Sequence, residues 1–381
     1  MSSARWFSSA RFDLGFFHLP IWLTWLCLFL LPASLLNLDE PLWVWLFVVV
    51  LVDVGHVWAS LYRTYLDPVT RKAWPKTLLL TPILVFFSCL LLAIHGNDTF
   101  WRVLSYVAAY HFVKQQLGIT ALYNARYFQR LTKTGAAVSF KAVLIFWDKA
   151  AIYAGTLGPL IWWHCHLPRQ FNWFIEGDFI NLSHLWGQWP PLLTQTLSLV
   201  FYMGWMGTLL FWLVLNFYYA HKHQQPLPFG KMLWVGGTAV NWYLGLVFFD
   251  SSLAFTVTNV IAHGIPYYGL IGLHQNRTRF TSPKRPAPQI LLLRMLLLLI
   301  PIWVLSLSEE YLWDFFLYRE NAAFFHSLIP YWREALSNPI WRAIAMAMLS
   351  LPQVVHYVLD GFIWKMDGSN PDLKQALFPS P

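Results

Sequence analysis

Charged side chains are scarce in this sequence. Asp, Glu, Lys and Arg make up 12% of the 381 residues, whereas 57% are hydrophobic. Soluble domains carry about 25% charged residues, so this composition excludes an ordinary soluble domain and predicts a protein that resides in a bilayer. The net charge of +8 does not indicate a nucleic-acid partner, because positive charge in a membrane protein follows the topology of its loops.

Several chemical motifs are also absent. The three cysteines, Cys27, Cys89 and Cys165, have neither CxxC nor CxxCH spacing, which excludes a disulfide framework and a c-type haem attachment site. The sequence contains no HExxH motif, no GxSxG motif and no Walker loop. It also lacks the HxxxH and HxxHH boxes of fatty-acid desaturases and hydroxylases.

Long apolar runs are abundant. About 20 apolar residues suffice to cross a bilayer as a helix. We therefore expect an all-α polytopic protein, a single transmembrane domain over residues 1–381 with about ten spans. The expected spans lie near 16–36, 41–62, 76–95, 99–124, 138–163, 190–219, 230–250, 251–273, 288–307 and 339–364. The aromatic segment 308–338 is too interrupted to span, and we expect it to lie on the membrane surface.

The basic residues predict the orientation of these spans. Most of the 26 Lys and Arg fall in the two termini and in the loops after the second, fourth, sixth and eighth spans. Because cytoplasmic loops are enriched in Lys and Arg, both termini are expected on the cytoplasmic side. The expected location is the bacterial cytoplasmic (inner) membrane.

Four histidines, each in a different expected span, are the main candidates for function. Ionisable residues inside a membrane are costly and usually serve a purpose. At about 1.5 Å per residue, His56, His111, His263 and His356 fall within about 7 Å of one another in depth. We therefore expect one buried site, although each histidine could instead make a hydrogen bond that packs two helices.

Each histidine has a polar neighbour on its own helix face, three or four residues away. Such partners orient metal-bound imidazoles or act as ligands themselves, and the sequence leaves both roles open. These neighbours are Asp53 for His56, Gln115 for His111, Asn259 for His263, and Asp360 together with Gln353 for His356.

Other polar residues extend these faces. Tyr267, Lys114 and Arg63 are candidate catalytic residues. Tyr267 and Lys114 could deliver protons or contact the substrate, and Arg63 lies on the His56 face. His274 is expected at the cytoplasmic end of the His263 face. Asp148 and Lys149 are expected to form a neutralising charge cluster with Lys114, since buried charges normally pair.

Imidazoles and carboxylates without thiolates suit iron, zinc or manganese. The short stretches around the four histidines, DVGH at 53–56, YHF at 110–112, AHG at 262–264 and PQVVHYVLD at 352–360, resemble the scattered motifs of the Brp/Blh family. That family comprises membrane-embedded, iron-dependent carotenoid 15,15'-dioxygenases. The resemblance implies that His56, His111, His263 and His356 are iron ligands, while the chain departs from the family in lacking a paired His-x-x-x-His.

These observations lead to one main hypothesis and two alternatives. The main hypothesis is a non-haem iron oxidoreductase, mono- or dinuclear, that acts on a lipid, isoprenoid or carotenoid-like substrate from the bilayer, with a possible electron donor as partner. The first alternative is a transporter that uses the His, Asp and Lys residues as a proton relay, with Gly236, Gly237 and Pro266 as the nearest signs of broken helices. The second is a haem b protein with two of the histidines as axial ligands.

Overall fold

The computed structural model describes residues 5–36, 41–133, 140–278, 288–370 and 372–378. Every regular element within these ranges is helical, which confirms the all-α prediction. The chain divides into two compact units, and two helices contribute residues to both units. They are α8 (Asn97–Lys133) and α13 (Ser252–Thr278).

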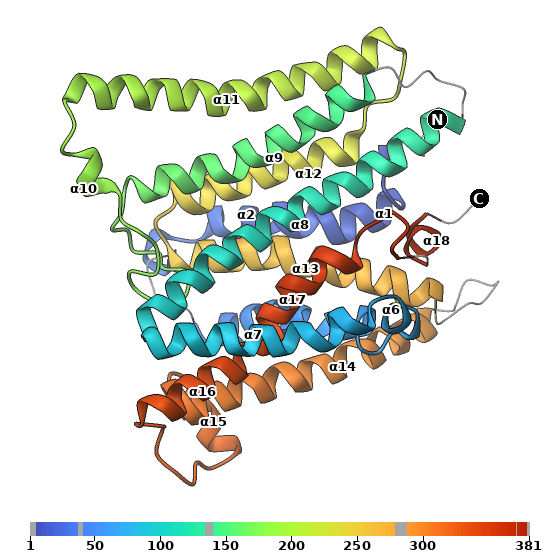
Figure 1. Cartoon of the computed structure of the whole chain (residues 1–381). Coiled ribbons are helices and arrows are strands. Elements are labelled where there is room, and N and C mark those ends of the chain that lie inside the picture. The colour runs from blue at the N-terminus through green and yellow to red at the C-terminus, as the bar shows by residue number, and fades with distance from the viewer. Residues whose placement is uncertain (1–4, 37–40, 134–139, 279–287, 371, 379–381) are drawn as a thin grey trace. The chain divides into compact units, whose positions relative to one another are not determined.

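The first unit comprises Met1–Glu40 and Ala108–His263. Helices α9, α11 and α12 lie side by side in this unit (Figure 1). Its elements are α1 (Ala10–Asp13), the π-helix η2 (Leu14–His18), α2 (Leu19–Leu30), α3 (Ala33–Leu36), α9 (Lys141–His164), α10 (Ser183–Trp186), α11 (Pro191–Lys222), α12 (Phe229–Tyr243) and the π-helix η5 (Leu244–Phe248), with the adjoining parts of α8 and α13.

The second unit comprises Pro41–Val107 and Gly264–Pro381. Here α7 packs against α16 and α17, and α14 packs against α5. Its elements are α4 (Leu42–Val44), the π-helix η3 (Trp45–Val54), α5 (Gly55–Ala59), the 3₁₀-helix η4 (Ser60–Arg63), α6 (Pro68–Ala73), α7 (Pro75–His95), α14 (Pro288–Trp313), the π-helix η6 (Asp314–Tyr318), α15 (Ala322–Leu328), α16 (Pro339–Leu349), α17 (Leu351–Ile363) and α18 (Leu373–Leu377).

Local sequence explains where several of these helices begin. Proline is favoured at the first helical position because its fixed φ suits the helix and its missing N–H is not needed there. Pro68, Pro75 and Pro339 occupy this position in α6, α7 and α16. The side chains of Asp67 and Asn338 cap α6 and α16 by accepting hydrogen bonds from the first backbone N–H groups.

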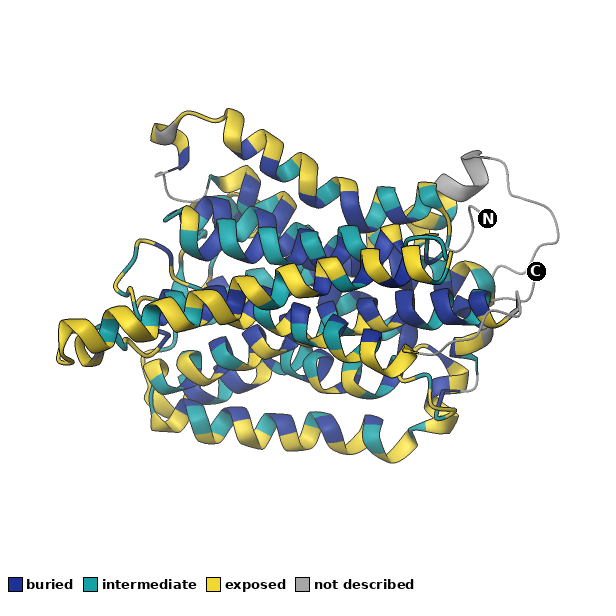
Figure 2. Ribbon diagram, turned by 90° about the horizontal axis from the view of Figure 1, so that it is seen from above, coloured by how far each residue is buried: buried dark blue, intermediate teal, exposed yellow. Residues whose placement is uncertain are grey.

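The exposed faces of the helices are apolar, which is compatible with an integral membrane protein. Buried and exposed positions recur along the same helices (Figure 2). On α7, the exposed positions include Leu79, Leu84, Phe87 and Leu91, whose exposed fractions are 61% to 67%. A leucine facing acyl chains carries no penalty, whereas in water such a surface would drive association.

Five helical segments among the described residues are long and apolar enough to cross a membrane. A bent pair, α16 and α17, meets at an angle of 41° and would make a sixth. The five segments are Ala10–Leu30, Leu42–Arg63, Pro75–His95, Pro191–Lys222 and Leu293–Tyr318. The structure thus supports a helical protein with five or six such segments, fewer than the ten expected spans.

Two expected boundaries differ from the observed helices. Helix α14 does not end near residue 307 but continues to Trp313 and into η6, so the first part of the segment 308–338 prolongs a long apolar helix. The tenth expected span is interrupted at Ser350, between α16 and α17. By contrast, Pro266 lies within α13, and Gly236 and Gly237 lie within α12, so neither position interrupts its helix.

Candidate metal centre

The first unit contains a buried pair of histidines, His111 on α8 and His263 on α13. Their ring centroids lie 5.0 Å apart, and the two ring planes are nearly perpendicular, at 80°. Each offers a ring nitrogen within 4.8 Å of the other. The ring of Phe112 stacks on one face of the His263 ring, with centroids 3.9 Å apart, and its other neighbours include Trp173.

The two amides expected beside this pair occupy different positions. The Gln115 Nε2 donates a hydrogen bond to the backbone carbonyl of His263, at 2.9 Å. Gln115 therefore links α8 to α13 at the histidine backbone. The side chain of Asn259 instead accepts a hydrogen bond from Asn241 at 3.1 Å and donates one to the carbonyl of Phe255 at 3.2 Å. Its polar atoms thus join α12 to α13.

The second unit contains a corresponding pair, His56 on α5 and His356 on α17. Both residues are buried, and their ring centroids also lie 5.0 Å apart, at an interplanar angle of 81°. Their ring nitrogens too lie within 4.8 Å of each other. The ring of Tyr267 makes edge contacts with both imidazoles, with centroids 5.6 Å from His56 and 5.1 Å from His356.

A carboxylate accompanies each histidine of this second pair. Asp53 Oδ1 lies 3.5 Å from His56 Nδ1, and Asp360 Oδ1 lies 3.6 Å from His356 Nδ1. The same Asp360 oxygen accepts hydrogen bonds from the Tyr267 hydroxyl at 2.9 Å and from Trp364 Nε1 at 3.2 Å. Carboxylates at this position can orient an imidazole toward a metal, as the helical spacing predicts.

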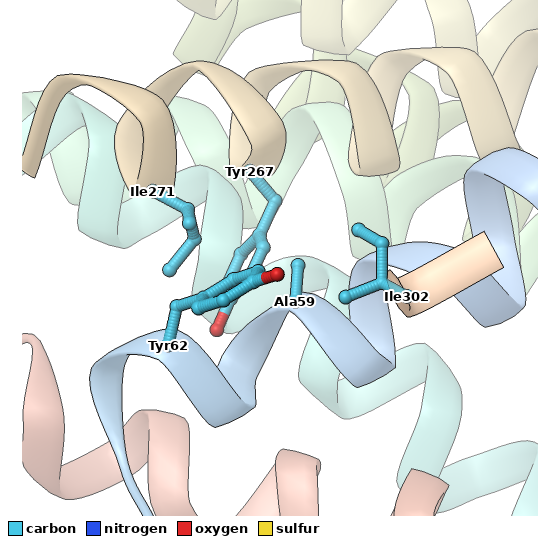
Figure 3. Packing of buried hydrophobic residues seen from close by; sticks show 5 residues of the cluster. All are labelled: Ala59, Tyr62, Tyr267, Ile271 and Ile302. Atoms are coloured by element: carbon cyan, nitrogen blue, oxygen red, sulfur yellow. The ribbon is translucent and has the colours of Figure 1, made fainter. Parts of the chain in front are cut away.

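Apolar packing holds Tyr267 in place. Its ring belongs to a buried cluster with Ala59, Tyr62, Ile271 and Ile302, which come from three separate parts of the second unit (Figure 3). Only 1% of Tyr267 is exposed, and its hydroxyl is directed to Asp360. The expected role of Tyr267 in proton delivery or substrate contact therefore rests on a side chain with a well-defined position.

Arg63 lies in a separate polar cluster of the second unit. Its guanidinium donates hydrogen bonds to Asp67 at 2.6 Å, to Asp372 at 3.3 Å and to the Thr70 hydroxyl. His274 contacts the other oxygen of Asp372 at 3.0 Å. The side chains of Asp67, His274 and Asp372 lie close enough together to bind one metal ion. Arg63, however, already supplies the positive charge that both carboxylates require.

This cluster shows what the sequence pattern missed. Asp372 lies after the last expected span, with no helical spacing that relates it to Arg63. Burial raises the pKa of Asp372, but the hydrogen bond from His274 and the nearby Arg63 charge outweigh burial and hold that pKa below its ordinary value. The sequence does indicate a structural role for Asp67, because an Asp followed by a proline, here Pro68, is typical of a helix N-cap.

The prediction that Asp148, Lys149 and Lys114 form a charge cluster was wrong. Asp148 is buried and instead forms a 2.8 Å ion pair with Lys231 of α12. Asn124 and Trp212 also donate hydrogen bonds to Asp148, at 2.8 Å and 2.7 Å. Lys149 and Lys114 are exposed, and the Lys114 ammonium lies 6.0 Å from the ring centroid of Tyr110.

Comparison with protein-family models, with curated proteins and with solved structures found no match for this chain.

Proposed function

We propose that this chain is a membrane-embedded oxidoreductase that binds non-haem iron through His56, His111, His263 and His356. In this proposal the enzyme oxidises a lipid, isoprenoid or carotenoid-like substrate that enters from the bilayer. One observation carries the proposal: each unit contains a buried pair of histidines, contributed by two helices, with ring centroids 5.0 Å apart.

Helix α13 provides the reason for assigning both pairs to one centre. It carries His263 of the first pair and, four residues later, Tyr267, whose ring contacts both histidines of the second pair. Side chains four residues apart on a helix lie on the same face, with Cβ atoms about 5–6 Å apart. The continuity of this helix thus favours one shared ion over two separate sites.

The donor set fits iron. Four imidazoles with Asp53 and Asp360 beside two of them form a site of nitrogen and oxygen donors, which suits iron, zinc or manganese. The resemblance of the histidine motifs to the Brp/Blh family favours iron among these metals. Iron would supply the oxidation, while the chain binds the substrate, orients it and excludes water. The proposal also includes an electron donor as a partner of the enzyme.

The spacing within each pair argues against axial ligation of haem by its two histidines. With metal–nitrogen distances of about 2 Å, two imidazoles on opposite sides of an ion would have centroids roughly 6 Å apart. The observed 5.0 Å fits adjacent coordination positions better. An absorbance spectrum tests this directly, because bound haem would give an intense Soret band.

A proton-coupled transporter is the second candidate, and the interrupted helix favours it. Discontinuous spans often form the binding sites of transporters. His356 lies on α17, the second half of the bent pair that turns by 41° at Ser350. This reading predicts substrate uptake driven by a pH gradient in vesicles that contain metal-free protein.

Metal analysis of the purified protein is the decisive experiment. We expect stoichiometric iron in the wild type, and a strong loss of iron in His56→Gln and His356→Gln variants that remain folded. His184→Gln is the matched control, because His184 is exposed. A fully folded wild-type protein that neither contains iron nor takes it up anaerobically would overturn the proposal.

We also propose the membrane topology expected from the sequence: about ten spans, with both termini cytoplasmic and the protein inserted in the bacterial cytoplasmic membrane. Four expected spans are not among the five or six apolar segments: 99–124, 138–163, 230–250 and 251–273. These four carry buried polar residues, including His111, Asp148, Lys231 and His263. Polar side chains that face other helices lower the apolarity of a span without exposing charge to lipid.

A further inference from the structure

The helix that leads to His56 has an unusual backbone. Residues Trp45–Val54 form the π-helix η3, in which the N–H of the following Gly55 donates to the carbonyl of Val50, five residues earlier. Most π-helices are single turns and often occur at functional sites. At ten residues, η3 is twice as long as η2, η5 and η6, which have five residues each.

Two side chains from other helices hold one carbonyl of this π-helix. The Leu51 carbonyl accepts a hydrogen bond from the Tyr268 hydroxyl of α13, at 2.6 Å. It accepts a second from Trp303 Nε1 of α14, at 3.0 Å. A carbonyl oxygen has two lone pairs, so these donors can satisfy both. Leu51 lies two residues before Asp53 and five before His56.

Close packing reinforces this contact. A Cβ atom on Gly55 would fall 2.1 Å from the Tyr268 hydroxyl, and one on Gly264 would fall 2.9 Å from the Val52 carbonyl oxygen. Glycine at both positions therefore allows η3 and α5 to approach α13. Helix α5, which carries His56, begins directly after η3. The register of η3 thus influences the position of the His56 ring.

We propose that Tyr268 and Trp303 are positioning residues that hold η3 in its π-helical register and so direct His56 and Asp53. A change from i−5 to i−4 pairing would alter the helical twist and rotate both side chains away from their present directions. Anchoring the Leu51 carbonyl opposes that change. The metal-related part of this inference rests on the proposed function, whereas the effect on the His56 ring does not.

The test compares two tyrosines that make the same kind of bond. Tyr268→Phe/Trp303→Phe removes both donors to Leu51, while Tyr62→Phe removes a hydroxyl that donates to the Leu298 carbonyl at 2.9 Å. Histidine side-chain NMR of the full-length, metal-free protein provides the first measurement, with the His56 resonance identified by its loss in His56→Gln. We expect a shift of this resonance in the double variant and little change in Tyr62→Phe.

Binding of Co²⁺ provides the second measurement. Loss of groups that orient a metal ligand typically weakens metal binding about 10- to 100-fold. We expect a loss of this size and altered Co²⁺ absorption bands in the double variant, with wild-type behaviour in Tyr62→Phe. An unchanged His56 resonance would refute the inference, and so would equal effects of the double variant and the control. If wild-type protein bound no metal, the proposed function would fail, but the NMR comparison would still decide this inference.

Discussion

Individual side chains determine whether buried charge is tolerated in this protein. Lys231 and Asp148 are 1% and 0% exposed, and each would be costly to bury alone. We expect Lys231→Met to lower the free energy of unfolding by about 3–5 kcal/mol, because it leaves the Asp148 charge uncompensated. Reversible unfolding in detergent micelles, monitored by tryptophan fluorescence, measures this loss.

The chain provides a close control for that substitution. Lys149 is adjacent to Asp148 in sequence but exposed, so Lys149→Met should change stability by no more than about 0.5 kcal/mol. The double variant Asp148→Asn/Lys231→Met should recover part of the loss, since it removes both charges. If Lys149→Met were the more damaging change, the pairing described here would be incorrect.

The Arg63 cluster predicts a dependence of stability on acid. The pKa of Asp372 is held below its ordinary value by His274 and Arg63 despite burial, so its carboxylate stabilises the folded state above the unfolded-state pKa of about 3.9. This contribution is lost as the pH falls through the lower, folded-state pKa. Unfolding midpoints measured from about pH 5 to about pH 2 should therefore decline in the wild type and decline less in Asp372→Asn.

The same substitution at Asp367 is the matched comparison. Its carboxylate is exposed and accepts hydrogen bonds from Ser369, so Asp367→Asn should leave most of the acid dependence in place. Identical pH profiles for Asp372→Asn and the wild type would contradict the assigned role of Asp372.

Sequence spacing identified most of the neighbours within a helix but few of the partners between helices. Asp53 beside His56 and Asp360 beside His356 follow from spacings of three and four residues. Lys231 and Asp372 could not be found in this way, because their partners lie on other elements and pairing depends on tertiary packing. The placement of Asn259 was unpredictable for the same reason, since Asn241 comes from α12.

At the scale of elements, glycine controls how closely η3 approaches α13. A Cβ on Gly264 would meet Val52 Cγ1 at 2.6 Å and the Val52 carbonyl oxygen at 2.9 Å, and a backbone atom cannot rotate away. Overpacking of this kind typically costs about 1–3 kcal/mol. We expect Gly264→Ala to destabilise the protein by that amount and to reduce its iron content, both measured on purified protein.

Gly272 on the same helix separates packing from helix propensity. A Cβ there would meet no atom within 4 Å among the described residues, so Gly272→Ala should be neutral or stabilise by up to about 1 kcal/mol. Similar destabilisation by the two substitutions would show that α13 is sensitive to any added methyl group, contrary to the packing argument.

Helix content was predictable from the apolar runs, whereas local helix type and bends were not. The sequence predicted a single span over 41–62, yet η3, α5 and η4 use three different hydrogen-bonding patterns there. The bend at Ser350 was likewise missed, while the positions marked by Gly236, Gly237 and Pro266 remain helical. Glycine and proline permit a break, but packing against neighbouring helices decides whether it forms.

At the scale of the whole molecule, the number of membrane crossings depends on how polar helices are counted. Helix α9 is 24 residues long and could span about 36 Å, which exceeds the hydrocarbon thickness of about 30 Å. It is not among the apolar segments, and it carries Asp148 and Lys149. Since Asp148 is buried against Lys231, its charge need not face lipid, and a membrane-spanning α9 remains physically reasonable.

Labelling of introduced cysteines on the two sides of α9 tests that crossing. Lys141 begins the helix and Glu176 lies in the segment that follows it, and both are exposed. Lys141→Cys and Glu176→Cys can therefore be compared after the three native cysteines are replaced by serine. We expect an impermeant maleimide to label Glu176→Cys in intact spheroplasts and Lys141→Cys only after permeabilisation, because the basic loop before α9 is expected in the cytoplasm. Labelling of both sites from the same side would exclude α9 as a span and reduce the proposed count of ten, whereas opposite labelling would show that a helix with a buried ion pair crosses the membrane.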